Sequence, residues 1–255
     1  MIDFQNVSFS YGEESSGGGI RNVNLTINTG EFVLLTGESG CGKTTITRLV
    51  NGLVPHYYEG NLEGDVLLDG KSVSDTPLYD LAAMVGSVFQ NPKSQFFNVD
   101  TDSELAFACE NLGYPQEDIL KRIDRTVSDY HIEDLMGRSV FALSGGEKQK
   151  IACASSSVLL PGIMVLDEPS SNLDMAAIDD LRQVLSLWKK QGKTILIAEH
   201  RLYYLHDLAD RVLYVKDGEI EREYTPAEYT RLLNLTAYRM ALEKKWGCGR
   251  FLSRS

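Results

Sequence analysis

The residues whose types and spacing most clearly predict chemistry are GESGCGKT, from Gly37 to Thr44. They fit G-x-x-x-x-G-K-[ST], in which glycines let backbone N–H groups approach a phosphate without a Cβ in the way. Lys43 is expected to reach the terminal phosphates of a nucleotide, and the Thr44 hydroxyl to ligate Mg²⁺. A hydrophobic run over 31–36 and a helical pattern over 44–53 flank the motif. We therefore expect a P-loop between a buried strand and a helix N-terminus, with an ordinary glycine-rich turn as the alternative.

Polar side chains also end three other predicted strands, one of which runs over 193–201 and ends at Glu199 and His200. The run IMVLDEP over 163–169 is apolar until Asp167 and Glu168. Burying carboxylates at the end of a strand costs free energy unless they interact with a polar partner, such as a metal ion or water. The strand predicted from Met84 ends at Gln90, which either lines a site or is an ordinary strand-end residue.

A second glycine turn is predicted at LSGGE, over 143–147. Ser144 suits a helix N-cap, and Glu147 stands three residues later, as in a capping box. Two adjacent glycines at a helix start can also form a second anion-binding surface. A well-capped helix with no such role is the alternative.

Alternating and helical patterns predict the elements that position these residues. Segments 2–12 and 20–28 alternate as an antiparallel hairpin laid beside the P-loop strand, and turn signals at Asp69-Gly70 and Asp217-Gly218 predict two more hairpins. Helical spacing takes over from 101 to 136. Tyr11 closes the first strand, where its ring either packs or stacks on a nucleotide base. The chain thus reads as α/β with an antiparallel β part and a small helical insertion.

Composition narrows the class further. The chain has 255 residues, 43% of them hydrophobic, which suffices for one large domain or a domain with a subdomain. A formal net charge of −11 disfavours a nucleic-acid binder. We expect no transmembrane helix, because no apolar run of 18 residues occurs, and no signal peptide at the start. Four cysteines without metal-like spacing suggest a reduced, cytosolic protein.

The order of these motifs resembles that of an ATP-binding cassette (ABC) ATPase. The P-loop, Gln90, LSGGEKQ, VLDE, SNLD and the strand-end His200 follow one another as in that family. The resemblance covers 1–235, and implies a P-loop NTPase core with an antiparallel β subdomain and a helical insertion subdomain at about 91–160. A short C-terminal helix and a basic tail are expected over 236–255. The family implies ATP hydrolysis, with ATP and Mg²⁺ as cofactors.

The resemblance also implies roles for single residues. Glu168 corresponds to the general base that polarises the attacking water, and His200 to the histidine that contacts the γ-phosphate. Asp167 corresponds to the acid associated with Mg²⁺, and Gln90 to the glutamine that contacts Mg²⁺ and water. Tyr11 corresponds to the aromatic residue that stacks on adenine. The expected nucleotide contacts of the P-loop are Gly37, Glu38, Ser39, Gly40, Cys41, Gly42, Lys43, Thr44 and Thr45.

A second chain is implied by the same family. LSGGE resembles the family signature, whose turn caps the γ-phosphate of ATP held by another subunit, so two chains should sandwich two ATP molecules head to tail. Asp174 belongs to the SNLD loop that signals across that dimer. The residues expected on this face are Ser144, Gly145, Gly146, Glu147 and Asp174. The sequence leaves open whether the dimer is a homodimer or a heterodimer, and whether this chain is one half of a tandem ATPase.

A narrower resemblance concerns the energy-coupling factor transporters. The segments FQNPKSQFF (89–97), DSELAFACENLG (102–113) and AEHRLYYL (198–205) look like those of their ATPases. That group implies uptake of vitamins or transition-metal ions through a transmembrane coupling protein and a substrate-binding membrane protein. It places the ATPase on the cytoplasmic face of the cell membrane. The alternatives are an ATPase of another ABC importer or exporter, a soluble ABC protein acting on nucleic acid, which the acidic composition disfavours, and a module that binds nucleotide without hydrolysing it.

Overall fold

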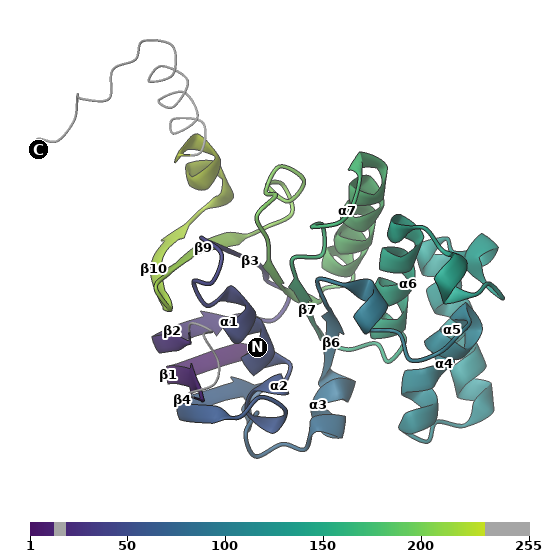
Figure 1. The fold of residues 1–255 in the computed structure, drawn as a ribbon, viewed down its shortest axis with the longest axis horizontal. Coiled ribbons are helices and arrows are strands. Elements are labelled where there is room, and N and C mark those ends of the chain that lie inside the picture. The colour runs from purple at the N-terminus through teal and green to yellow at the C-terminus, as the bar shows by residue number, and fades with distance from the viewer. Residues whose placement is uncertain (13–18, 233–255) are drawn as a thin grey trace, which may run out of the picture.

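A six-stranded sheet forms the centre of the protein, whose computed structural model describes residues 1–12 and 19–232 (Figure 1). Its strand order is β10-β9-β3-β8-β7-β6, parallel except for the antiparallel edge strand β10. The strands are β3 (Phe32–Thr36), β6 (Val85–Val88), β7 (Ile163–Asp167), β8 (Thr194–Ala198), β9 (Arg211–Lys216) and β10 (Glu219–Tyr224). Strands β3 and β8 are buried at every residue, as expected of parallel strands covered on both faces.

A separate antiparallel sheet has the order β2-β1-β4-β5. It consists of β1 (Ile2–Tyr11), β2 (Ile20–Ile27), β4 (Gly60–Leu68) and β5 (Lys71–Ser72). The predicted hairpins are therefore confirmed, but the first one does not lie beside the P-loop strand in one sheet. Its buried face instead shares a core with Val33 and Leu35 of β3, because alternating strands have one apolar face to cover.

Helices cover both faces of the central sheet. They are α1 (Lys43–Val50), α2 (Leu53–His56), α3 (Leu78–Met84), α4 (Thr101–Asn111), α5 (Gln116–Tyr130), α6 (Gly145–Ser157) and α7 (Met175–Lys190). Alternate residues of β3 point to opposite faces, so Val33 and Leu35 join the core with α1, whereas Phe32 and Leu34 join the core with α6 and α7. None of the helices in the described ranges is long and apolar enough to cross a membrane.

The helical insertion lies beyond α6, on the side away from the small sheet (Figure 1). Helices α4 and α5 are separated at Gly113-Tyr114-Pro115, and α6 packs against both of them and against α7. Two boundaries differ from the sequence analysis. Met84 ends a helix, α3, that the sequence analysis did not predict, and β6 ends at Val88, two residues before Gln90. The division at 235 and the expected C-terminal helix and tail over 236–255 stay predictions, because these residues lie outside the described part.

Candidate functional site

The P-loop is a tight glycine turn between β3 and α1. Gly37, Gly40 and Gly42 all have positive φ, and a Cβ on Gly37 would lie 2.1 Å from the Val215 carbonyl oxygen. Only glycine fits there. Helix α1 begins after Gly42 without a side-chain cap and without an acid in its first turn. Its first N–H groups and the positive end of its dipole are therefore left for an anion.

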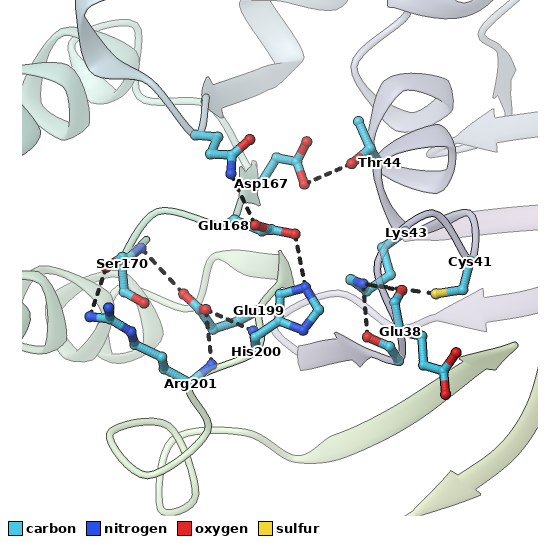
Figure 2. Close-up of polar contacts among 12 residues, drawn as sticks. Glu38, Cys41, Lys43, Thr44, Asp167, Glu168, Ser170, Glu199, His200 and Arg201 are labelled. Carbon is cyan, nitrogen blue, oxygen red and sulfur yellow. Dashed lines mark hydrogen bonds and ion pairs between the residues drawn. The ribbon is translucent and has the colours of Figure 1, made fainter. Parts of the chain in front are cut away.

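Lys43 is held inside this turn. Its side chain is buried, and its Nζ donates to the carbonyl oxygens of Gly37 at 3.0 Å and Glu38 at 2.9 Å, with the Cys41 sulfur at 3.8 Å (Figure 2). The structure thus brings one fixed positive charge into the turn that the sequence predicts to bind phosphates. Cys41 and Thr45 are buried beside it.

The predicted Mg²⁺ residues Thr44 and Asp167 meet at the end of β7. The Thr44 hydroxyl donates to Asp167 Oδ1 at 3.2 Å. Burial raises the pKa of Asp167, so a bound cation would relieve an unfavourable buried charge. Oxygen donors of this kind fit Mg²⁺, which takes one or two protein ligands and completes its shell with phosphates and water. No group of three or more His, Cys, Asp or Glu side chains that could hold a metal ion occurs in the part of the chain that the structure describes.

Three strand ends converge on Glu168. Its Oε2 accepts a hydrogen bond from Gln90 Nε2, and its Oε1 contacts His200 Nε2, both at 3.0 Å (Figure 2). The Glu168 backbone has a φ of 45°, unusual for a residue with a Cβ, and its N–H donates to the Ala198 carbonyl at 2.8 Å. The structure therefore brings together three of the predicted catalytic residues, from the ends of β6, β7 and β8.

One buried carboxylate near this cluster was not assigned a role by the sequence. Glu199 follows β8, is 1% exposed, and accepts hydrogen bonds from the Ser170 and His200 backbone N–H groups (Figure 2). The available signal was an acid at the end of a mostly apolar strand, the same signal that singled out Asp167 and Glu168.

The signature turn forms a different kind of surface. The Ser144 side chain accepts from the Glu147 N–H, and the Glu147 carboxylate accepts from the Ser144 N–H, so the predicted capping box is confirmed. These bonds to Ser144, with the Arg138 guanidinium, lower the pKa of Glu147 to about 2. A cavity of about 420 Å³ has Ser144, Gly145, Gly146, Glu147 and Asp174 among its lining residues. None of the residues that line it belongs to the P-loop.

Tyr11 is half-buried at the end of β1. Its ring makes edge contacts with Phe9 and Tyr58, and its hydroxyl lies 3.2 Å from Thr45 Oγ1 and 3.0 Å from Arg48 Nη1. The structure thus shows the packing role that the sequence left open, next to the P-loop helix. Stacking on adenine stays a prediction.

Comparisons with known proteins agree with this arrangement. The family model described as ABC transporter matches residues 20–171. A protein of Treponema denticola named as an ABC transporter ATP-binding protein is 49% identical over 223 residues, which are 88% of this chain and 45% of that protein. One of Pyrococcus abyssi, with the same kind of name, is 40% identical over 229 residues, 89% of this chain and 81% of that protein. The chain thus spans less than half the length of the Treponema relative.

Solved structures show the same fold. The cbiO1 protein of Clostridium perfringens, described as part of the ABC transporter complex cbiONQ, superposes with a TM-score of 0.79 at 26% identity, over 96% of this chain and 98% of that one. The ATP-binding cassette MJ0796, solved as a dimer in a post-hydrolysis state with ADP and phosphate, gives a TM-score of 0.75 at 26% identity, over 89% and 99%. The chain therefore belongs to the ABC transporter family, as an ATPase domain with that family's mixed α/β fold.

Proposed function

We propose that this chain is the ATP-hydrolysing subunit of a membrane importer of the energy-coupling factor type, which takes up a vitamin or a transition-metal ion. The convergence of Gln90 and His200 on Glu168, beside the P-loop, carries the catalytic part of the proposal. The likeness to cbiO1, a member of a cbiONQ complex, supports the transporter type.

In this proposal the residues of one chain hold ATP and orient water. Lys43 and the N–H groups at the start of α1 bind the phosphates. Thr44, Asp167 and Gln90 would hold Mg²⁺, which neutralises charge on the phosphates when bound. Glu168 accepts the proton of the attacking water, and Gln90 and His200 hold its two carboxylate oxygens in place.

The second half of each site would come from another chain. Gly145, Gly146 and Ser144 line a surface cavity that contains no P-loop residue, so they are available to the nucleotide of a partner. A head-to-tail dimer would place this turn over the γ-phosphate of ATP bound by the other subunit. The dimeric state of the neighbour MJ0796 supports this arrangement.

A groove between the core and the helical insertion is our candidate for the docking site of the membrane partner. This cavity of about 310 Å³ is lined by residues that include Leu78, Phe89, Phe97 and Phe107. The Phe97 side chain is 76% exposed and stacks on Phe107 with 5.0 Å between ring centroids, as expected of an apolar surface that another protein covers. We infer that a transmembrane coupling protein, which carries a substrate-binding membrane protein, docks there at the cytoplasmic face of the membrane.

Gln95 links this groove to the catalytic cluster. Its side chain donates to Ser87 O at 3.2 Å and to Ser156 Oγ at 2.9 Å, and accepts from Phe89 N at 3.2 Å. It therefore ties the segment leading to Gln90 to helix α6. A displacement of the groove is thereby transmitted toward Gln90 and Glu168.

The catalytic assignment is tested by Glu168→Gln. This variant keeps the shape of the side chain but lacks the basic carboxylate, so steady-state ATP hydrolysis should fall by about 100-fold or more. The dissociation constant for Mg-ATP should stay within about two-fold, because binding does not depend on the base. Glu31→Gln is the matched control, since Glu31 pairs with Arg211 at the opposite end of β3. Wild-type turnover in Glu168→Gln would refute the role of Glu168.

The transporter type is tested by recovery of the chain from its native membranes. A coupling protein together with a separate substrate-binding protein is expected, and Phe97→Ala should reduce their recovery. Recovery with the membrane domains of another importer or exporter would favour the broader alternative. The relatives' names, which specify an ABC transporter ATP-binding protein without a transporter type, agree with that alternative as well.

A further inference from the structure

Glu199 occupies the centre of the fold, next to the proposed catalytic cluster. It follows β8, which lies between β3 and β7, and its own N–H donates to the Leu35 carbonyl of β3 at 3.0 Å. Its side chain is 1% exposed. A buried carboxylate is costly unless its oxygens accept hydrogen bonds, so the partners of Glu199 indicate what it does.

The two oxygens of Glu199 have different partners. Oε1 accepts from the backbone N–H groups of His200 at 2.7 Å and Arg201 at 3.0 Å. These bonds shape the turn that carries the His200 ring. Oε2 accepts from the Ser170 N–H at 3.3 Å and from the Tyr204 hydroxyl at 2.9 Å. The Ser170 bond crosses to the loop after β7, so one carboxylate joins two loops.

Arg201 makes a second connection between the same loops. Its Nη1 donates to the Ser170 carbonyl oxygen at 3.2 Å (Figure 2) and to the Leu173 carbonyl oxygen at 3.1 Å. The segment 168–174 begins at Glu168 and ends at Asp174, which caps helix α7 and lines the cavity at the signature turn. The linked segment thus joins the catalytic carboxylate to the surface proposed to face the partner chain.

We propose that Glu199 is a positioning residue, which holds the His200 turn and the 168–174 segment in one fixed relation so that His200 and Glu168 meet. The inference rests on the catalytic roles proposed for those two residues. Glu199 itself touches neither ATP nor water in this proposal. Displacements of about 1 Å in such a constellation cost up to about 100-fold in rate, so the loss of one link between the loops is measurable.

The substitution Glu199→Gln separates the two functions of the side chain. Its remaining oxygen can accept from His200 and Arg201, which preserves the local turn. Its amide group then faces the Ser170 N–H, donor against donor, and the bond between the loops is lost. The Tyr204 hydroxyl, kept protonated because burial raises the pKa of Tyr204, can rotate to accept from the amide.

The first readout is the split between kcat and KM. We expect kcat, normalised to the number of nucleotide-binding sites, to fall about 10-fold or more in Glu199→Gln. The KM for ATP and the dissociation constant for ADP should change less than about two-fold, since Lys43 and the P-loop are untouched. Glu31→Gln, a change of the same type at the far end of β3, should keep the wild-type kcat.

The second readout is the ring resonance of His200 in the folded protein. Sequence positions 56, 131, 200 and 206 are the four histidines, and His200→Ala identifies the signal by its disappearance. In Glu199→Gln the His200 signal should shift while the His56 and His131 signals stay in place. A change that only lowers stability would leave all these folded-state signals unmoved.

The outcomes separate this inference from the proposed function. If the wild-type protein hydrolyses ATP and Glu199→Gln keeps the wild-type kcat and His200 signal, the positioning role is refuted. If Glu168→Gln hydrolyses ATP normally, the proposed catalytic role fails instead. Where Glu199→Gln does not fold, Glu199→Asp keeps the charge but is too short to span both loops, and its kcat should fall similarly. A normal kcat in Glu199→Asp would refute the inference equally.

Discussion

The P-loop and the signature turn are both glycine turns at the start of a helix, yet they treat that helix end in opposite ways. Helix α1 has Gly42 as its N-cap, with no side-chain cap and no acid in its first turn. Helix α6 has Ser144 as its N-cap and a complete capping box, in which Glu147 supplies a negative charge. The backbone N–H groups at the start of α1 are therefore left for a ligand, whereas at the start of α6 the Ser144 and Glu147 side chains already accept hydrogen bonds from the backbone.

The side-chain charges at the two turns also favour anion binding at the P-loop. Lys43 brings a buried positive charge into the P-loop, whereas the signature turn carries the Glu147 carboxylate, paired with Arg138 at 2.8 Å. An anion therefore gains both backbone donors and a cation at the first turn. At the second it gains mainly the glycine N–H groups. The comparison teaches that two similar sequence motifs form unequal halves, of which only the first combines an uncapped helix end with a cation.

The sharpest way to break this comparison is Lys43→Ala. Removing the only P-loop cation should weaken ATP binding by about 100-fold, or ~2.7 kcal/mol, as expected for a charge-assisted contact to phosphate. The matched change Ser144→Ala, at the signature turn, should alter ATP binding by the single chain less than about two-fold. Calorimetric titration at a protein concentration that keeps the chain monomeric measures both. Equal losses in the two variants would contradict the unequal halves.

Motif spacing predicted the site better than it predicted the sheets around it. Gln90, Glu168 and His200 each stand at the end of an apolar run, and strand ends of a parallel sheet share one edge. Their convergence was therefore implied, although the sheet order was not. The first hairpin packs against the P-loop strand from a separate sheet, a detail that the sequence left open because alternation reports that one face is buried and does not say which element covers it.

Contacts between distant segments were beyond the reach of local patterns. Glu199 has the same strand-end position as Glu168, but its carboxylate turns inward to Ser170, and side-chain direction depends on neighbours that only the fold supplies. The same holds for Tyr11, whose hydroxyl reaches Thr45 and Arg48 on α1. Helix α3 was missed because its seven residues contain one buried side chain, Leu81, and so leave no helical period to detect.

A subunit-mixing experiment sharpens the comparison by asking whether the unequal halves act across two chains. Lys43→Ala disables one half, and Gly146→Asp the other, since a Cβ at Gly146 would lie 2.8 Å from the Ala177 Cβ. Each variant alone should be inactive. In a head-to-tail dimer, an equal mixture forms one intact site in each mixed dimer. With random pairing and independent sites, hydrolysis should recover to about a quarter of the wild-type rate.

The control is a mixture of wild-type protein with either single variant, which fixes the rate expected from dilution alone. The rate of ATP hydrolysis after unfolding and refolding the chains together provides the measurement. If the mixture does not recover ATP hydrolysis although each single variant still forms a folded dimer, both halves of a site belong to one chain.

The smallest expected effect concerns the charge that distinguishes the signature helix. The hydrogen bonds from Ser144 lower the pKa of Glu147 to about 2 in the folded protein, against about 4.3 for an unfolded glutamate. A depressed folded-state pKa contributes stability above the unfolded value, and this contribution is lost as the pH falls through about 4 toward 2. Glutamine can keep the capping-box hydrogen bonds, so Glu147→Gln removes the charge and, with it, the pairing to Arg138.

We therefore expect Glu147→Gln to lower the free energy of unfolding by ~1 kcal/mol at pH 7, a modest value because the side chain is 30% exposed. The difference from wild type should shrink toward zero as the pH approaches 2. Glu117→Gln is the matched control, because Glu117 also lies in the first turn of a helix but pairs with Lys121 at the exposed surface. Its effect should be below ~0.5 kcal/mol. Urea unfolding between pH 3 and pH 7 measures both, and a Glu147→Gln difference independent of pH would contradict the assigned role of the charge.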